Sequence, residues 1–250
     1  LFLLVPSVTQ SFGVSALPSV TRAFQTGDSQ KLKRTVEAVL RITFLTALPM
    51  GVGLSVLAQP AALLIYGARP GTVIVGRVLT TLGAASVFAA LCGPLNSILQ
   101  AMGHVELPVV LTLIGLFVKA VLDYTLAAVP SVNVLGGAVG TLVCYALASV
   151  LACIAIRRIA GVKIDFFSTF KKPFLASVCC GVAALLAHKA WCAVLPESRF
   201  SALPAVFLGA LIYVVFLLIA RGICEEDIKA LPNGEKITKR LEKYLQKAGG

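Results

Sequence analysis

Residues 135–156 read LGGAVGTLVCYALASVLACIAI, a stretch that contains no charged side chain. About 20 apolar residues in a helix are enough to cross the hydrocarbon core of a bilayer. Because lipid offers no hydrogen-bond partner, every backbone N–H and C=O in such a stretch must be paired within a helix. The pair Arg157-Arg158 follows directly, so this stretch predicts a transmembrane helix that ends at a basic segment.

The same kind of stretch recurs along the whole chain. Hydrophobic residues make up 58% of the 250 residues and the mean hydropathy is +0.93, well above the values of soluble domains. We expect seven spans, at Leu1–Arg22, Val36–Leu57, Val78–Met102, Pro108–Val129, Leu135–Ile156, Pro173–Leu195 and Ala202–Ala220. The predicted fold class is therefore all-α: a polytopic membrane protein with a helical lobe over residues 1–221 and a tail over residues 222–250.

The basic residues that give the net charge of +11 alternate between the segments that join these spans. Sixteen fall after the first, fifth and seventh spans: Arg22, Lys31, Lys33, Arg34, Arg157, Arg158, Lys163, Lys171, Lys172, Arg221, Lys229, Lys236, Lys239, Arg240, Lys243 and Lys247. The segments on the other side hold only Arg69, Arg77 and Arg199. The positive-inside rule places the richer set and the C-terminus in the cytoplasm and the first residue outside. An outside start without a leading Met leads us to expect that the chain is the later part of a longer protein.

Several classes of function find no support in the residues. Six of the seven cysteines lie inside apolar spans, where Cys behaves as a small hydrophobic residue, and no C-x-x-C occurs. The chain has two histidines and no P-loop, G-x-S-x-G or H-E-x-x-H motif. We therefore predict no metal, no cofactor, no nucleic-acid partner and no enzymatic activity.

Few ionisable residues lie at membrane depth, where each costs about 2.5–3.5 kcal/mol on insertion scales. Lys119 and Asp123 stand four residues apart in the fourth span. Either the two charges neutralise each other, or Lys119 faces a central cavity with Asp123 as its counter-ion or as a proton carrier. Arg41 and Glu37 lie near the cytoplasmic end of the second span. Arg41 either extends to the inner headgroups or forms an anion site at a cavity mouth, with Glu37 beside it.

Two further patterns concern the first span and the tail. The first span contains Pro6, Pro18 and hydroxyl side chains at Ser7, Thr9, Ser11, Ser15, Ser19 and Thr21, which predicts a helix that lines a cavity. In the tail, Ile237, Leu241, Tyr244 and Leu245 follow helical spacing among Lys236, Lys239, Arg240 and Lys243. Such a basic amphipathic helix either binds anionic lipids or packs on the cytoplasmic loops.

Small residues open the fifth span. Gly136 and Gly140 form a G-x-x-x-G pair, which permits two helices to approach closely. Between the second and third spans, the apolar residues 58–67 are too short to cross a bilayer and predict an interfacial or re-entrant segment.

Several stretches resemble a known superfamily. They are residues 22–24, 27–34, 40–42, 48–49, 51–60, 94–103 with Pro108, 118–124, 136–141, 144–145, 226–228 and 231–234. In this order they resemble the second half of the multidrug/oligosaccharidyl-lipid/polysaccharide flippases, most closely the stage V sporulation protein B group of polysaccharide biosynthesis proteins. That group is kin to the lipid II flippases.

The resemblance implies a protein with two pseudo-symmetric lobes, of which this chain is the second. It also implies a polyprenyl-diphosphate-linked sugar as substrate, carried by alternating access, and a cavity arginine at the position of Arg41. We expect Arg41 and Lys119 to attract the diphosphate. The alternatives are a cation-coupled exporter of small molecules from the same superfamily and a membrane scaffold for cell-wall or spore enzymes.

Overall fold

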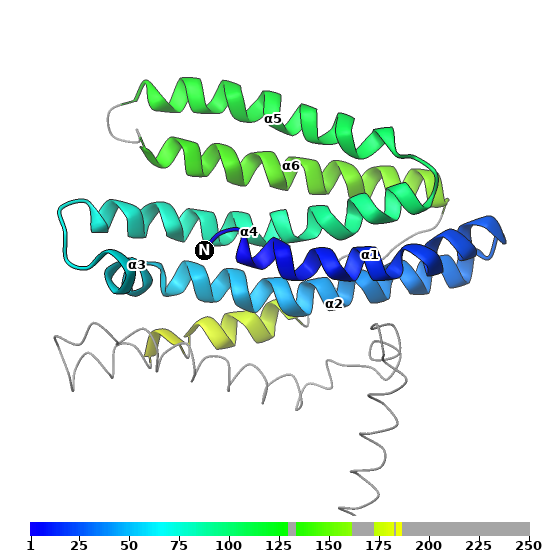
Figure 1. Ribbon diagram of the computed structural model, residues 1–250, viewed down its shortest axis with the longest axis horizontal. Helices are drawn as coiled ribbons and strands as arrows, with labels where there is room; N and C mark the ends of the chain where they lie inside the picture. Colours follow the sequence, from blue (N-terminus) through cyan, green and yellow to red (C-terminus); the bar gives the residue numbers. More distant parts are fainter. Residues whose placement is uncertain (130–133, 162–172, 183, 187–250) are drawn as a thin grey trace, which may run out of the picture.

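The computed structural model describes residues 1–129, 134–161, 173–182 and 184–186, and every secondary-structure element in these ranges is an α-helix. Figure 1 labels α1 (Leu4–Gln25), α2 (Ser29–Val56), α3 (Ala58–Tyr66), α4 (Thr72–Ala101), α5 (Glu106–Ala127) and α6 (Val134–Ala160). The all-α prediction is confirmed. The end of the predicted sixth span, the predicted span Ala202–Ala220 and the tail 222–250 lie outside the described residues.

Four described helices, α2, α4, α5 and α6, are both long enough and apolar enough to cross a membrane. Helix α1 was expected to span over Leu1–Arg22 and has the length, but no 18-residue stretch of it is as apolar as the most apolar stretch of each of these four. Its exposed surface carries polar side chains, including Ser7, Gln10 and Ser11. The same surface also carries the exposed apolar side chains of Leu4, Val8 and Val14.

Only residues 26–28 join α1 to α2, although the polar residues on either side suggest a longer connector. Gly27 has φ +68°, a left-handed conformation that glycine adopts without steric cost. The side chain of Asp28 then accepts a hydrogen bond of 3.0 Å from the backbone N–H of Lys31 and caps α2. Helix α2 therefore begins at Ser29 and not at Val36, because charged residues continue a helix beyond the apolar stretch.

Helix α4 is the central element of the bundle, with α1, α2 and α3 packed on it and α6 on its other side (Figure 1). Leu95, Ile98 and Leu99 of α4 are almost fully buried in one cluster with Val20 of α1 and Leu40 of α2. Helix α5 is the outermost and packs mainly on α6. The short helix α3 fills the predicted segment 58–67 and packs against α4 at Gly76.

Glycines let the helix backbones approach closely on α4. A Cβ atom added at Gly13 of α1 would lie 2.7 Å from the Cα of Pro94 in α4. One added at Gly83 of α4 would lie 2.6 Å from the backbone nitrogen of Ser55 in α2. At the second contact the Ser55 hydroxyl donates a hydrogen bond of 3.0 Å to the carbonyl of Thr80. Small residues with a hydroxyl beside them are the usual means of joining helices in lipid.

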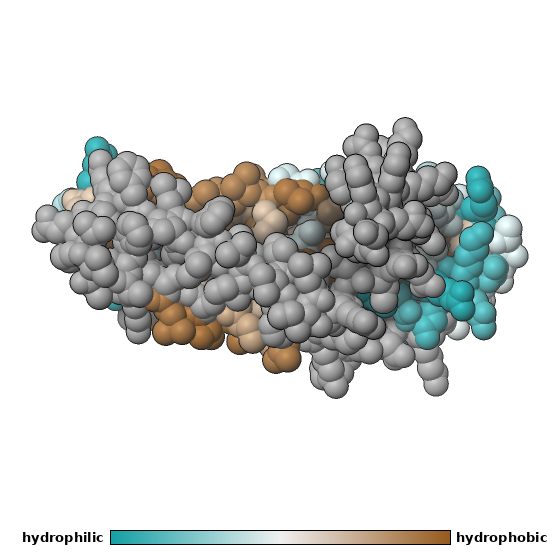
Figure 2. Space-filling model, turned by 90° about the horizontal axis from the view of Figure 1, so that it is seen from below, coloured by the Kyte–Doolittle hydropathy of each residue, from teal (hydrophilic) through white to brown (hydrophobic). Residues whose placement is uncertain are grey.

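The outer surface has the composition expected of a protein embedded in a bilayer. Only Pro108 and Gly115 of α5 are buried, whereas Phe117 and Tyr124 are 73% and 84% exposed. In Figure 2 the coloured residues are hydrophobic along the middle of the molecule and hydrophilic toward its ends. Side chains of this kind are stable in contact with hydrocarbon, so we assign the middle zone to the membrane.

The close contact at Gly83 yields a stability prediction. Gly83→Ala places a methyl group against the backbone of α2, which cannot move without separating the two helices. We expect a loss of about 1–3 kcal/mol, measured as a lower apparent melting temperature of the detergent-solubilised protein.

Gly53 of α2 provides the matched control. It is also inside a helix, but a Cβ atom there has nothing within 4 Å. Gly53→Ala should leave the melting temperature unchanged or raise it slightly, since Ala favours helix more than Gly does. Equal destabilisation by both substitutions would contradict the close packing of α2 on α4.

Candidate functional site

Helix α1 has two faces of opposite character. Val5, Thr9, Gly13, Ala16 and Val20 are buried and repeat at intervals of three or four residues, the spacing of one helix face. The opposite side carries the polar face of α1, which we define as Ser7, Gln10, Ser11, Ser15 and Arg22. Three of these are serines four residues apart, so their hydroxyls form a row along the helix. Exposed apolar side chains, Leu4, Val8 and Val14, lie among them, so the cavity-lining role predicted for this segment stays a prediction.

Gln10 is the residue of this face that the sequence reasoning missed. Its side chain is exposed, and it makes no hydrogen bond within the ranges that the structure describes. A serine can donate to a carbonyl of its own helix, as Ser15 does to Ser11 at 2.9 Å, but a primary amide has more groups to satisfy. In hydrocarbon, an amide without a partner costs several kcal/mol. Gln10 therefore requires water or another polar partner on this face.

Thr9 corrects part of the sequence-based expectation. It was grouped with the hydroxyl side chains of the cavity-lining helix, but it is fully buried and faces α4. Its hydroxyl donates a hydrogen bond of 2.9 Å to the carbonyl of Ala90. Thr9 therefore joins α1 to α4. The helical spacing of the sequence by itself places Thr9 about half a turn around the helix from Ser11 of the polar face.

Arg41 and Glu37 are half-buried on α2, which packs beside both α1 and α4. Glu37 lies 3.7 Å from the ammonium of Lys33, one turn toward the start of the helix. Neither Glu37 nor Arg41 is an isolated charge. Their predicted roles in binding an anion stay predictions.

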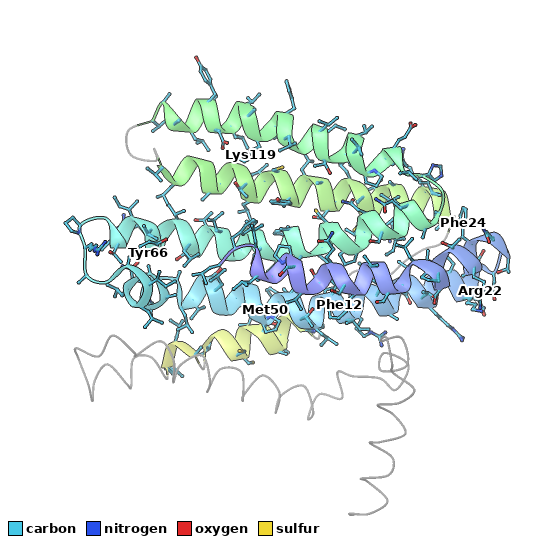
Figure 3. All side chains as sticks on the ribbon, viewed as in Figure 1. Phe12, Arg22, Phe24, Met50, Tyr66 and Lys119 are labelled. Carbon is cyan, nitrogen blue, oxygen red and sulfur yellow. The ribbon has the colours of Figure 1, made fainter. Side chains whose placement is uncertain are left out.

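Lys119 and Asp123 form the ion pair that their spacing suggests. The Lys119 ammonium donates to Oδ2 of Asp123 within α5. The pair lies between α5 and α6, where Figure 3 labels Lys119. A Cβ atom added at Gly140 of α6 would lie 2.1 Å from Oδ1 of Asp123 and 3.5 Å from Cγ of Lys119. Oδ1 is buried there and has no hydrogen-bond partner in the described part of the chain.

The glycine pair of α6 accounts for this close contact. Gly136 lies against Leu126 of α5, one turn before Gly140 lies against Asp123. The G-x-x-x-G prediction of close helix packing is therefore confirmed, with α5 as the partner helix. Any side chain at Gly140 would displace the carboxylate of Asp123.

The structure does not bring the two predicted pairs together. Helices α5 and α2 lie on opposite sides of the bundle, with α6 and α4 between them (Figure 1). Arg41 on α2 and Lys119 on α5 therefore do not form a single cluster. Their placement on separate helices does not support a shared role in binding one diphosphate, and that role stays a prediction.

Basic residues gather at one end of the bundle. The turn between α1 and α2 follows Arg22 and precedes Lys31, Lys33 and Arg34. The last turn of α6, which holds Arg157 and Arg158, reaches the same end (Figure 1). Arg22 and Tyr66, labelled in Figure 3, mark opposite ends. The predicted alternation of charge is thus present in the described helices.

The comparisons with known proteins agree on one family. The model of the family described as "Lipid II flippase MurJ" matches residues 7–215. The chain is 24% identical over 237 residues to stage V sporulation protein B of Bacillus subtilis (strain 168), covering 92% of this chain and 43% of that protein. It is 24% identical over 156 residues to the lipid II flippase MurJ of the same organism, covering 62% and 28%. The chain spans less than half the length of these relatives.

A solved structure of the lipid II flippase MurJ in an inward closed conformation has a similar fold. The two superpose with a TM-score of 0.61 at 18% identity, over 88% of this chain and 45% of the other. At this identity the likeness concerns the fold alone.

The Lys119–Asp123 pair yields a prediction that separates structural pairing from an independent role of either charge. Lys119→Met or Asp123→Leu alone leaves one unpaired charge at membrane depth, and we expect each to destabilise the protein by about 2.5–3.5 kcal/mol. The double variant removes both charges and should recover most of that loss. Apparent melting temperatures of the four proteins give the coupling energy. Additive losses would show that the two charges do not depend on each other.

Proposed function

The chain belongs to the lipid II flippase MurJ family, and on this basis we propose that it forms part of a flippase for a polyprenyl-diphosphate-linked sugar. The substrate class is a peptidoglycan or polysaccharide precursor, moved across the cell membrane. The similarity to stage V sporulation protein B extends the proposal to a role in spore formation.

The observation that carries the proposal is the polar face of α1. A sugar diphosphate crossing the membrane needs polar partners along its path, because a charged group in hydrocarbon is costly. The exposed amide of Gln10 and the serine row of α1 supply such partners, and the amide itself requires polar surroundings. We propose that this face lines a water-filled route for the headgroup while the prenyl chain stays in the bilayer.

Arg41 is the residue we assign to the diphosphate. It is half-buried on α2, which packs beside α1, and a guanidinium matches phosphate oxygens with two parallel hydrogen bonds. Lys119 is the second predicted cation, but its ammonium is already paired with Asp123. We propose a larger effect on substrate binding for Arg41 than for Lys119, because α2 packs beside α1 whereas α5 lies on the far side of the bundle, with Glu37 and Asp123 as counter-ions.

The basic end of the bundle supports one orientation. With this end in the cytoplasm, the α1–α2 turn and the last turn of α6 lie at the inner, anionic leaflet. Transport would then follow alternating access, in which the lobe containing these helices rocks around a central route. The predicted tail residues Lys236, Lys239, Arg240 and Lys243 would lie at the same inner leaflet.

Cysteine labelling tests the water-filled route. In the complete reading frame with its native cysteines replaced, Gln10→Cys and Ser11→Cys should react with a membrane-impermeant thiol reagent. Leu113→Cys, an exposed position on α5, should react at least about tenfold more slowly, because only thiolate in contact with water reacts. Equal protection of all three cysteines would show that the polar face of α1 is not in contact with water.

A transport assay tests the function itself. The complete reading frame is reconstituted in liposomes with a fluorescent polyprenyl-diphosphate sugar, under proton and sodium gradients and a membrane potential. We expect Arg41→Ala to lower the initial flipping rate about 10-fold or more, the factor expected for losing a charged hydrogen bond to phosphate.

Two variants control this experiment. Arg41→Lys keeps the charge but not the two-bond geometry and should give an intermediate rate. Arg158→Ala removes an exposed charge from the last turn of α6 and should transport at nearly the wild-type rate. Normal flipping by Arg41→Ala would remove Arg41 from the mechanism, and the absence of flipping by folded wild-type protein would refute the proposal.

A further inference from the structure

An apolar cavity lies between α2, α4 and α6. Its volume is about 630 Å³, and its described walls come from α2, α4, α6 and the helical residue Phe174. Its walls include Leu48 and Val52 of α2, Phe88 of α4 and Ile154 of α6. No residue of α1 is among these wall residues, so the cavity is separate from the proposed headgroup route.

The cavity is open on the outside of the protein. Ala84, Val150 and Ile154 belong to its walls and are exposed, which means that they are accessible from the surroundings. Residues 173–182 cover one side, because Gly181 lies against Val52 of α2. The cavity is thus a partly covered groove between packed helices, within the range of about 300–1,000 Å³ typical of sites for small ligands.

The membrane setting decides what fills such a groove. Its three helical walls, α2, α4 and α6, are all apolar enough to span a bilayer. Water does not occupy apolar cavities in stable form, whereas burying a CH₂ group gains about 0.8 kcal/mol. At membrane depth the apolar molecules in contact with the opening are lipid chains. Hydrocarbon is therefore the occupant that its walls favour.

Among the described residues that line the groove, one is charged. Arg157 belongs to the wall and lies in the last turn of α6, at the basic end of the bundle. A guanidinium has five N–H donors, so it can bind a phosphate in addition to other partners. Basic sites between transmembrane helices at the cytoplasmic side are typical positions for anionic lipid headgroups.

We propose that the cavity holds one acyl chain of a resident anionic phospholipid, whose headgroup phosphate binds Arg157. The lipid is a structural partner of the bundle and is distinct from the transported substrate. Its chain fills the space that α2, α4 and α6 leave between them.

Native mass spectrometry of the complete reading frame tests the proposal without any transport measurement. The detergent-solubilised protein is mixed with dioleoyl phosphatidylglycerol or dioleoyl phosphatidylcholine, and lipid bound to the folded protein is counted. We expect one tightly retained lipid with a preference for phosphatidylglycerol. The lipid that co-purifies from the host membrane is identified by mass in the same spectra.

Two matched pairs of variants locate the site. Ala84→Trp fills the groove and should abolish retention, whereas Ala120→Trp, on the exposed surface of α5, should not. Arg157→Gln should weaken phosphatidylglycerol binding about fivefold, the factor equivalent to about 1 kcal/mol per basic residue at the surface. Arg158→Gln removes the same charge from the neighbouring exposed position and should have less than half that effect.

Several results would overturn the proposal. They are the absence of bound lipid on the wild-type protein, retention by Ala84→Trp equal to that of Ala120→Trp, or a polyprenyl lipid found in place of a phospholipid. If Ala84→Trp does not fold, the Arg157 and Arg158 pair decides, because both variants change only exposed side chains. Equal affinity of that pair for phosphatidylglycerol would remove the assigned headgroup contact.

Discussion

Close approach of helix backbones to α4 is the constraint on which the rest of the described structure depends. In lipid, burial of apolar side chains gives little driving force for helix association, because hydrocarbon surrounds the helices in either state. The association must come from packing and from hydrogen bonds between helices. Gly13 and Gly83 remove the Cβ atoms that would hold α1 and α2 away from α4, and Thr9 and Ser55 add hydrogen bonds at these contacts. With α1 fixed in this way, its opposite face is held at a defined angle.

The two faces of α1 link this packing to function. Residues of the buried face are small or apolar, so they settle the position of the helix. Ser7, Gln10 and Ser11 of the polar face are exposed. Gln10 takes part in both roles, since its Cβ and Cγ lie near Gly93 of α4 while its amide has no hydrogen-bond partner in the described ranges. An amide in that position is costly in a bilayer unless polar groups or water lie in front of it.

The apolar stretches of the sequence predict the described helices well. They indicate which residues lie in the membrane, but not where each helix begins or ends. Helix α4 begins at Thr72 and not at Val78, because Arg77 is compatible with a helix that continues into the aqueous phase. The Lys119–Asp123 pair follows from spacing within one helix. Its contact with Gly140 depends on the rotation of α6 relative to α5, which no local pattern encodes. Thr9 and Ser11 are different, because their spacing of two residues already places them on different sides of one helix, and one joins two helices while the other is exposed.

The polar face of α1 and the apolar cavity are formed by different residues of the bundle. A lipid-linked sugar has a charged head and a long hydrocarbon chain, and no single surface is compatible with both. The polar face of α1 is compatible with the head and contributes nothing to the apolar cavity. The cavity, lined by α2, α4 and α6, is compatible with a hydrocarbon chain and has Arg157 in its wall. If a resident phospholipid occupies that cavity, the cavity is not available to the prenyl chain of the proposed substrate.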